Sequence, residues 1–255
     1  MGVLKLIPVL FRIGPFTLYS FGLMAALAFL AGRWVLLRGL ERRGIPRTEG
    51  EAYTWGALAG GLAGAHIYYL VEHWEEVLTD PLGTIFSGAG LVWYGGLLGG
   101  AAVCLAILFI KRHPLGDVAD AFGPGLAITY AVGRIGCFLS GDGCYGTPCG
   151  LPWCMAFPDG VVPTTVRVHP TPLYETIMTL AIFAGLKRME RRPLPAGSIF
   201  WAYVGLASLE RFLAGFTRDI PHIFGGLDTV QLLSILGMAL ALAAGLRLRA
   251  RGRIV

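Results

Sequence analysis

Charged residues are scarce in this 255-residue sequence. Asp, Glu, Lys and Arg together make up 15% of the chain, whereas a soluble domain carries about 25%. Hydrophobic residues make up 55%, and the mean hydropathy is +0.64. So few charges exclude an ordinary soluble domain and predict a protein embedded in lipid. The net charge is +5, but the sequence has no basic groove with interleaved aromatic residues, so we expect no nucleic-acid partner.

Lys and Arg are almost absent from every second gap between the long apolar stretches. Residues 73–90 contain none, residues 140–170 contain only Arg167, and residues 216–227 contain only Arg218. The basic residues concentrate in the other gaps and in the tail, at Arg38, Arg42, Arg43, Arg47, Lys111, Arg112, Lys187, Arg188, Arg191, Arg192, Arg247, Arg249, Arg251 and Arg253. Because cytoplasmic loops retain Lys and Arg, this alternation predicts an N-terminus that faces out and a cytoplasmic C-terminus.

About seven segments are apolar and long enough to cross a bilayer core, which takes roughly 20 residues per helix. They lie at approximately residues 16–36, 52–72, 90–110, 117–139, 171–187, 197–215 and 228–246. An odd number agrees with termini on opposite sides. We therefore predict an all-α integral membrane protein, with residues 1–255 forming a single transmembrane domain. The basic loops favour anionic membrane lipids as partners.

The segment before the first span is apolar but carries Lys5 and Arg12. It runs from Val3 to Phe16 and is too short to form a membrane span. We expect it to lie in the outer interface as an amphipathic helix.

Small residues recur at helical spacing in the second and third spans. The GxxxG pairs are built from Gly56, Gly60 and Gly64 in one span and from Gly95, Gly99, Gly96 and Gly100 in the other. Such stripes let helix backbones approach closely in lipid. We interpret these glycines as packing positions that do not themselves indicate catalysis.

Among the charged residues within or at the ends of predicted spans, where charge is costly and usually marks function, four stand out. They are Arg134, Glu175, Glu210 and Arg211. The predicted topology assigns all four to the outer half of the bilayer. Two arginines at headgroup depth favour a phosphate ligand, because a guanidinium fork matches phosphate oxygens. A simpler alternative is that the arginines only pair with Glu175 or Glu210 for packing. Such pairing would also orient an arginine that binds phosphate.

Residues 140–168 form the longest predicted outer loop, rich in Gly and Pro and therefore expected to be irregular. We interpret it as a lid or wall over the arginines. Four of the five cysteines cluster in and beside it, at Cys137, Cys144, Cys149 and Cys154. Two disulfides are the first expectation, with three possible connectivities. A zinc site is weaker because there is no CxxC pair. A reactive thiol is the third alternative, with Cys137 next to Arg134 as its best candidate.

Five segments of this chain, in order, resemble motifs of the prolipoprotein diacylglyceryl transferases, which are bacterial membrane enzymes. The most specific are Gly133-Arg134-Ile135-Gly136-Cys137-Phe138-Leu139-Ser140-Gly141 and His169-Pro170-Thr171-Pro172-Leu173-Tyr174-Glu175. The others are Tyr19-Ser20-Phe21-Gly22-Leu23-Met24, Tyr94-Gly95-Gly96-Leu97-Leu98-Gly99, and the pair Arg211 and Arg218. The resemblance covers nearly the whole chain.

The resemblance implies transfer of the diacylglyceryl group of phosphatidylglycerol to a lipobox cysteine near the signal peptide of a client prolipoprotein. It places the protein in the bacterial cytoplasmic (inner) membrane, as a multi-pass protein. Arg134 and Arg211 would bind the phosphate and stabilise it as it leaves, and the client cysteine would be the nucleophile. The substrate-binding candidates that complete this site are Gly146, Glu175, Glu210 and Arg218. We expect no cofactor and no metal.

The chain departs from the family pattern at several motif positions. Tyr94 stands where the family has His, and Cys137 stands where the signature usually carries Asn. Phe21 replaces the first-helix Tyr, and Gly215 occupies the position of a Glu. Tyr94 would then assist proton transfer or donate a hydrogen bond to a phosphate or an ester. Two alternatives stay open: a paralogue that uses its outer cysteines for thiol or sulfur chemistry, and a non-catalytic binder or transporter of lipids or small molecules.

Overall fold

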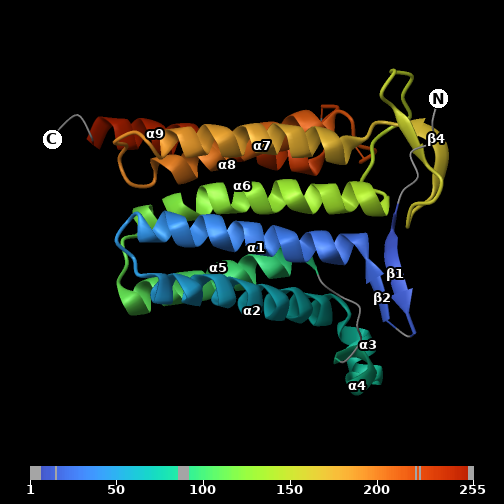
Figure 1. Ribbon diagram of the computed structural model, residues 1–255, viewed down its shortest axis with the longest axis horizontal. Helices are drawn as coiled ribbons and strands as arrows, with labels where there is room; N and C mark the ends of the chain where they lie inside the picture. Colours follow the sequence, from blue (N-terminus) through green and yellow to red (C-terminus); the bar gives the residue numbers. More distant parts are fainter. Residues whose placement is uncertain (1–6, 15, 86–91, 222, 224, 252–255) are drawn as a thin grey trace. The chain divides into compact units, whose positions relative to one another are not determined.

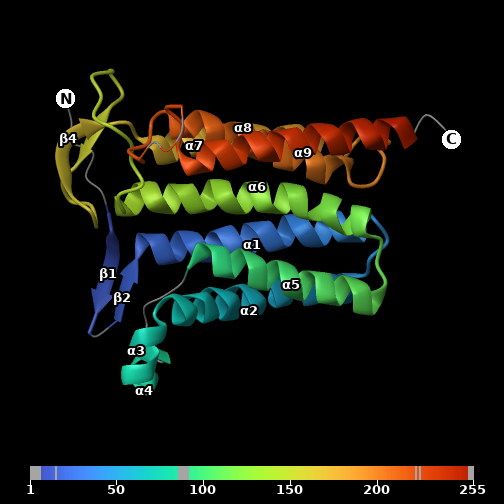
Figure 2. The same cartoon turned by 180° about the vertical axis from the view of Figure 1, so that it is seen from behind.

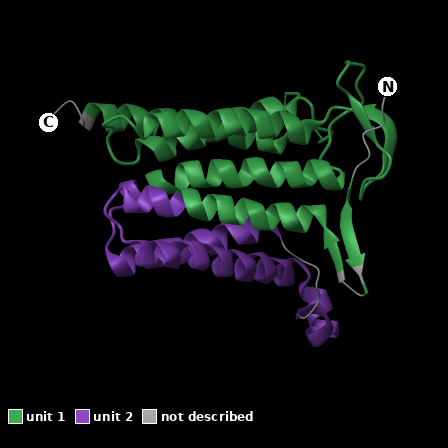
Figure 3. Ribbon diagram, viewed as in Figure 1, with its two compact units in different colours: residues 1–35, 119–255 green, residues 36–118 purple. Residues whose placement is uncertain are grey.

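The computed structural model describes residues 7–14, 16–85, 92–221, 223 and 225–251. The chain divides into two compact units (Figure 3). Unit 1 comprises Met1–Val35 and Ala119–Val255, and unit 2 comprises Leu36–Val118. Two helices cross the division, so each unit contains part of both.

Each of the predicted spans corresponds to a long helix (Figure 1). The long helices are α1 (Ser20–Glu41), α2 (Arg47–Glu72), α5 (Trp93–Lys111), α6 (Leu115–Ser140), α7 (Thr171–Met189), α8 (Ser198–Gly215) and α9 (Thr229–Arg251). Two short helices, α3 (Trp74–Thr79) and α4 (Pro81–Ile85), come after α2. The structure is therefore mostly helical, as the sequence predicts.

Within the described part of the chain, four helices are long and apolar enough to cross a membrane by length and composition. They are Ser20–Glu41, Tyr94–Lys111, Leu115–Ser140 and Thr229–Ala250. Polar side chains lower the hydropathy of the other long helices. In α8 the adjacent pair Glu210 and Arg211 interrupts an otherwise apolar sequence, and in α7 Glu175 does the same. In α7 and α8, the residues that lower the hydropathy thus include three candidate site residues.

In unit 1, helices α6, α7 and α8 share a core. Ala127 of α6 packs with Ile182 and Leu186 of α7 and with Ile199 of α8, and all four are buried. Helix α9 packs along α8, as both views show (Figures 1 and 2). Asp120 of α6 accepts hydrogen bonds from the first backbone N–H groups of α8, at 2.9 Å from Gly197 N and 2.8 Å from Phe200 N.

The N-terminal segment forms a β-hairpin, so the predicted amphipathic helix is wrong wherever the segment is described. Strand β1 (Val9–Ile13) pairs antiparallel with β2 (Phe16–Tyr19). Gly14 at the turn has a φ of +58°, a left-handed conformation that glycine adopts without steric cost. The first six residues of the chain lie outside the described residues.

In unit 2, helices α2 and α5 approach each other along their glycine stripes, which confirms the packing interpretation. A Cβ atom at Gly64 would overlap the carbonyl oxygen of Gly95, and one at Gly99 would overlap that of Gly60. The two backbones therefore touch where side chains would normally separate them. These glycines are required by contact between helices.

We expect Gly64→Ala to lower the stability of unit 2 by about 1–3 kcal/mol, because the added methyl group would force the two backbones apart. Gly61→Ala is the matched control on the same helix. A Cβ there would meet its nearest neighbour, the Gly96 carbonyl oxygen, at 3.6 Å, which is an ordinary contact. Thermal unfolding in detergent should give a lower Tm for the first variant only. Equal Tm values would contradict the close packing.

Candidate active site

Glu175 is the centre of a cluster of three arginines in unit 1. It lies one turn into α7, and its side chain is 0% exposed. Its Oε1 accepts hydrogen bonds from Arg211 Nη1 at 2.8 Å and from Arg218 Nη2 at 2.9 Å. Its Oε2 pairs with Nη2 of Arg134. One buried carboxylate thus holds three guanidinium groups, contributed by α6, by α8 and by the segment after α8.

Tyr130 joins two of these arginines and was not singled out by the sequence. Its hydroxyl oxygen accepts a hydrogen bond from Arg211 Nη1 at 3.3 Å. Its ring centroid lies 5.7 Å from Cζ of Arg134, within the range of a cation–π contact. The signal that would have found it is its position four residues before Arg134, which places both on one helix face.

The cluster carries an excess of positive charge. Three guanidinium groups face Glu175 and the nearby Glu210, so positive charge remains even when both carboxylates are ionised. Nε of Arg134 and Nε of Arg218 are buried donors without a hydrogen-bond partner in the described part of the chain. The arginine side chains are 10%, 27% and 17% exposed for Arg134, Arg211 and Arg218. Such a cluster suits an anion that reaches it from the exposed side.

Glu210 is buried like Glu175, but it does not bind the arginines as Glu175 does. It is 4% exposed, and its Oε1 has no hydrogen-bond partner among the described residues. It is close enough to interact electrostatically with Glu175 and the three arginines. The sequence left open which carboxylate pairs with the arginines, and the structure gives that place to Glu175.

Gly146 connects the loop at residues 140–168 to the ends of α7 and α8. Its N–H donates to the carbonyl oxygen of His169 at 2.8 Å, and the next N–H, of Thr147, donates to the carbonyl oxygen of Thr217 at 2.9 Å. A Cβ atom at Gly146 would overlap the Thr217 carbonyl and approach Thr171 Oγ1 to 2.7 Å. Only glycine fits there, against the residue that precedes Arg218 in the chain.

We expect Gly146→Ala to push the loop away from Thr217 and to displace the adjacent Arg218. The cost of such overpacking is about 1–3 kcal/mol. Gly150→Ala is the control within the same loop, since a Cβ there meets nothing within 4 Å. A protease-protection or Tm measurement on both variants checks the difference. Identical behaviour would show that the loop accommodates the methyl group.

The loop at residues 140–168 is more ordered than its Gly and Pro content predicts. Strands β3 (Met155–Phe157) and β4 (Thr164–Val168) pair antiparallel within it. Phe157 and Val168 pack against Phe138 at the end of α6. These contacts provide the small core that fixes the loop on unit 1.

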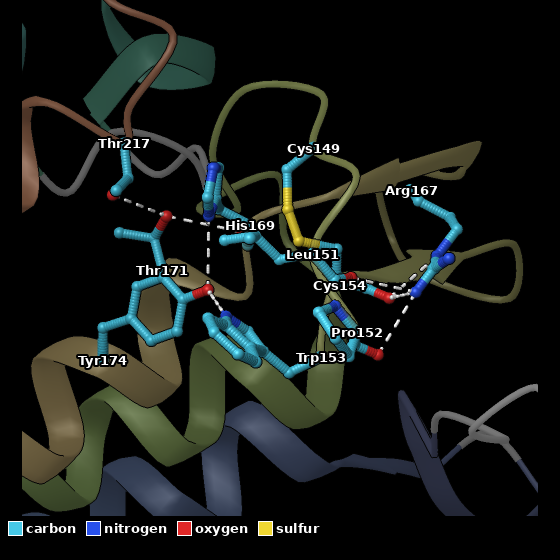
Figure 4. Close-up of a disulfide and its surroundings, with 10 residues drawn as sticks. All are labelled: Cys149, Leu151, Pro152, Trp153, Cys154, Arg167, His169, Thr171, Tyr174 and Thr217. Atoms are coloured by element: carbon cyan, nitrogen blue, oxygen red, sulfur yellow. Dashed lines mark hydrogen bonds between the residues drawn. A yellow bond between two sulfur atoms is a disulfide. The ribbon is translucent and has the colours of Figure 1, made fainter.

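A disulfide joins Cys149 to Cys154, with Cα atoms 6.0 Å apart (Figure 4). The guanidinium of Arg167 donates to the carbonyl oxygens inside this short loop, at 2.8 Å to Cys154, 3.2 Å to Leu151 and 3.3 Å to Pro152.

The second expected disulfide is not formed, because Cys137 and Cys144 are free thiols. The sulfurs of the bonded pair also lie near His169, but cysteines in a disulfide do not serve as thiolate ligands.

A chain of hydrogen bonds fixes the entry to α7, as Figure 4 shows. Trp153 Nε1 donates to the hydroxyl of Tyr174 at 2.8 Å, and that hydroxyl lies 3.2 Å from Nδ1 of His169. Since the indole can only donate, the Tyr174 hydroxyl donates its own hydrogen to His169. The chain of bonds positions Glu175, the next residue after Tyr174. His169 and Trp153 therefore have a supporting role here.

Tyr94 belongs to unit 2, in the first turn of α5, and is 53% exposed. The arginines and Glu175 belong to unit 1. The role of Tyr94 in proton transfer stays a prediction.

Comparison with known proteins identifies the family of this chain. The family profile described as "Prolipoprotein diacylglyceryl transferase" matches residues 8–247. The chain belongs to this family. A phosphatidylglycerol–prolipoprotein diacylglyceryl transferase of Nostoc sp. is 32% identical over 92% of this chain and 87% of its own length. The proteins of the same name from Geobacter sulfurreducens and Dehalococcoides mccartyi are each 31% identical, over 94% and 92% of this chain and 96% and 90% of their own lengths.

Gly215 stands where the resemblance implies a motif Glu, and the structure leaves no room there for a longer side chain. A Cβ at Gly215 would lie 2.6 Å from Cγ of Gln231, a buried side chain of α9. Gln231 is itself fixed, because Asp228 and Gln231 exchange hydrogen bonds at 3.0 and 2.8 Å in a capping box at the start of α9. Gln231 therefore occupies the space that a longer side chain at position 215 would need.

Proposed function

We propose that this protein transfers the diacylglyceryl group of phosphatidylglycerol to the thiol of a lipobox cysteine in a prolipoprotein. Family membership supports the reaction class. The observation that carries the assignment to residues is the binding of three arginines by the single buried carboxylate Glu175. An anionic phosphodiester is the ligand such an excess of guanidinium charge favours.

In the proposed reaction the client thiolate attacks the glycerol carbon that carries the phosphate ester. The carbon–oxygen bond breaks, and glycerol phosphate leaves with the bonding electrons. Arg134 and Arg211 stabilise the charge that develops on the leaving phosphate, since preorganised donors act most strongly where charge appears. Arg218 adds charge at the same place, and Glu175 orients all three guanidinium groups. Gly146 maintains the contact between the outer loop and the segment that carries Arg218.

The client thiol must lose its proton before or during attack. Tyr94 is our candidate for assisting that transfer or for orienting the substrate. Glu210, whose Oε1 is buried and unpartnered among the described residues, adds negative charge that limits the excess around the arginines. Neither a cofactor nor a metal takes part in the proposed steps.

We further propose a single domain of seven membrane spans in the bacterial cytoplasmic membrane, with the N-terminus outside and the C-terminus in the cytoplasm. The alternation of basic gaps supports this topology. Along α7, Glu175 and Lys187 are separated by 12 positions, which is roughly 18 Å of helix. With the basic end of α7 in the cytoplasm, Glu175 lies toward the outer leaflet, where a signal peptide and phosphatidylglycerol would meet it.

Transfer of labelled diacylglyceryl from phosphatidylglycerol vesicles to a lipobox peptide tests the proposal directly. We expect a thioether-linked peptide and release of glycerol phosphate by the purified protein, and rescue of a strain depleted of its own transferase. A well-folded preparation that yields no lipidated peptide and does not rescue the strain would exclude the proposal. Thiol chemistry with another acceptor, or lipid binding without a covalent product, would then become the better explanation.

A further inference from the structure

The free thiols Cys137 and Cys144 form a cluster that the proposed transfer does not use, because the nucleophile in that reaction is the client cysteine. Cys137 lies at the end of α6, and Cys144 lies in the adjoining loop. Their sulfur atoms and a carboxylate oxygen of Asp142 all lie within 4.8 Å of one another. Two cysteines seven positions apart are thus brought together by the turn at the end of α6.

The two thiols differ in access and in surroundings. Cys137 is buried and accepts a hydrogen bond from Nη1 of Arg134 at 3.5 Å. Cys144 is half-buried, and its backbone N–H donates to Oδ1 of Asp142 at 3.1 Å. The hydrogen bond from the Cys137 thiol and the charge of Arg134 lower the pKa of Cys144 below its ordinary value, against the opposing effects of burial and of Asp142. Cys144 is therefore the thiol that a reagent reaches and that is most readily ionised.

Two sulfurs and a carboxylate would also suit a divalent metal ion. The guanidinium of Arg134 argues against this use, because it places a fixed positive charge 3.5 Å from one of the sulfurs. That charge repels a cation and stabilises a thiolate. The cluster is consequently better suited to thiol–disulfide chemistry than to metal binding.

We propose that Cys137 and Cys144 are a redox-active dithiol that closes to a disulfide by exchange with a disulfide-bearing oxidant. The Cys144 thiolate attacks one sulfur of the oxidant, forming a mixed disulfide and releasing one thiol. Cys137 then attacks the sulfur of Cys144, which forms the internal bond and releases the second thiol. The two cysteines lose two electrons to the oxidant, and their two protons end on the two thiols released from it.

The test uses the purified full-length protein, with oxidised glutathione as the oxidant and with peptide mapping by mass spectrometry as the readout. We expect a Cys137–Cys144 cross-link that forms without any lipid substrate, so its outcome is independent of transfer activity. Cys137→Ser should stop at one glutathione adduct on Cys144, and Cys144→Ser should react at least about tenfold more slowly at Cys137. Cys104→Ser, which removes the other free thiol, should leave the cross-link unchanged.

The pH dependence of alkylation provides a second measurement in the unaltered protein. The initial rate at Cys144 should rise with pH through a midpoint below the value of about 8.5 for an ordinary thiol, because the thiolate is the reactive form and the pKa of Cys144 is lowered. The proposal is overturned by a stoichiometric zinc ion that protects both thiols in the purified protein. It is also overturned by a glutathione adduct on Cys144 that Cys137 does not displace, or by cross-links that join either thiol only to Cys149 or Cys154. Linkage mapping of the unaltered protein decides the matter even where a variant fails to fold.

Discussion

Replacing Arg134 or Arg211 by alanine is expected to lower the rate of diacylglyceryl transfer by about 10²–10³-fold, the usual cost of losing one donor to developing charge. Each arginine approaches Glu175 from a different helix, at Oε2 for Arg134 and at Oε1 for Arg211. Loss of either leaves the carboxylate with two other guanidinium partners. The fold should therefore survive while transfer is lost, and the rate should fall more than the Tm.

A lysine variant tests whether the positive charge alone or also the shape of the guanidinium group is needed for transfer, and an exposed arginine provides the control. Arg134→Lys retains the positive charge but loses the guanidinium fork, so its rate should fall between those of the parent and of Arg134→Ala. Arg47→Ala serves as the control, since this arginine is 56% exposed and pairs with Glu41 at 3.5 Å. Steady-state transfer to a lipobox peptide gives the rates. Near-normal rates in both Arg134→Ala and Arg211→Ala would remove these residues from the reaction.

Glu175→Gln is expected to have the largest effect on stability, about 3–5 kcal/mol, because removing one partner of a buried ion cluster leaves uncompensated charge. Three guanidinium groups would then face one another without their shared carboxylate. Transfer activity should fall as well, since the arginines lose the group that orients them. Chemical or thermal unfolding in detergent, measured together with transfer, provides both readouts.

Glu41→Gln is the matched control for Glu175→Gln. It removes a carboxylate from an exposed pair, with side chains 56% and 39% exposed for Arg47 and Glu41, and such pairs contribute about 0–1 kcal/mol. A similar change in Tm for the two variants would mean that Glu175 does not hold the cluster together. High salt should weaken the Glu41 pair and leave the Glu175 cluster nearly unaffected.

The positions of the long helices can be predicted directly from the sequence, because each apolar run has the length that a bilayer requires. The apolar residues of the N-terminal hairpin do not predict it, since they fit a helix and a strand equally well in so short a segment. The Gly14-Pro15 pair between Arg12 and Phe16 is the turn signal in the sequence that does indicate a hairpin. Short apolar segments are commonly ambiguous in this way.

The candidate site could be predicted as a set of residues but not as an arrangement. Intramembrane charge was sufficient to select Arg134, Glu175, Glu210 and Arg211. Which carboxylate meets the arginines depends on how α7 and α8 are rotated about their axes, and the sequence does not specify that rotation. The same holds for the cysteines, whose pairing depends on the path of the loop between Ser140 and Thr171.

The short turn between Cys149 and Cys154 is held by the disulfide and also by hydrogen bonds from Arg167. Its guanidinium is bonded to the carbonyl oxygens of Leu151, Pro152 and Cys154, so the backbone between the cysteines is held by more than the covalent bond. The shape of this turn should therefore persist in a reducing environment. The loop can therefore present the same backbone surface whether Cys149 and Cys154 are oxidised or reduced.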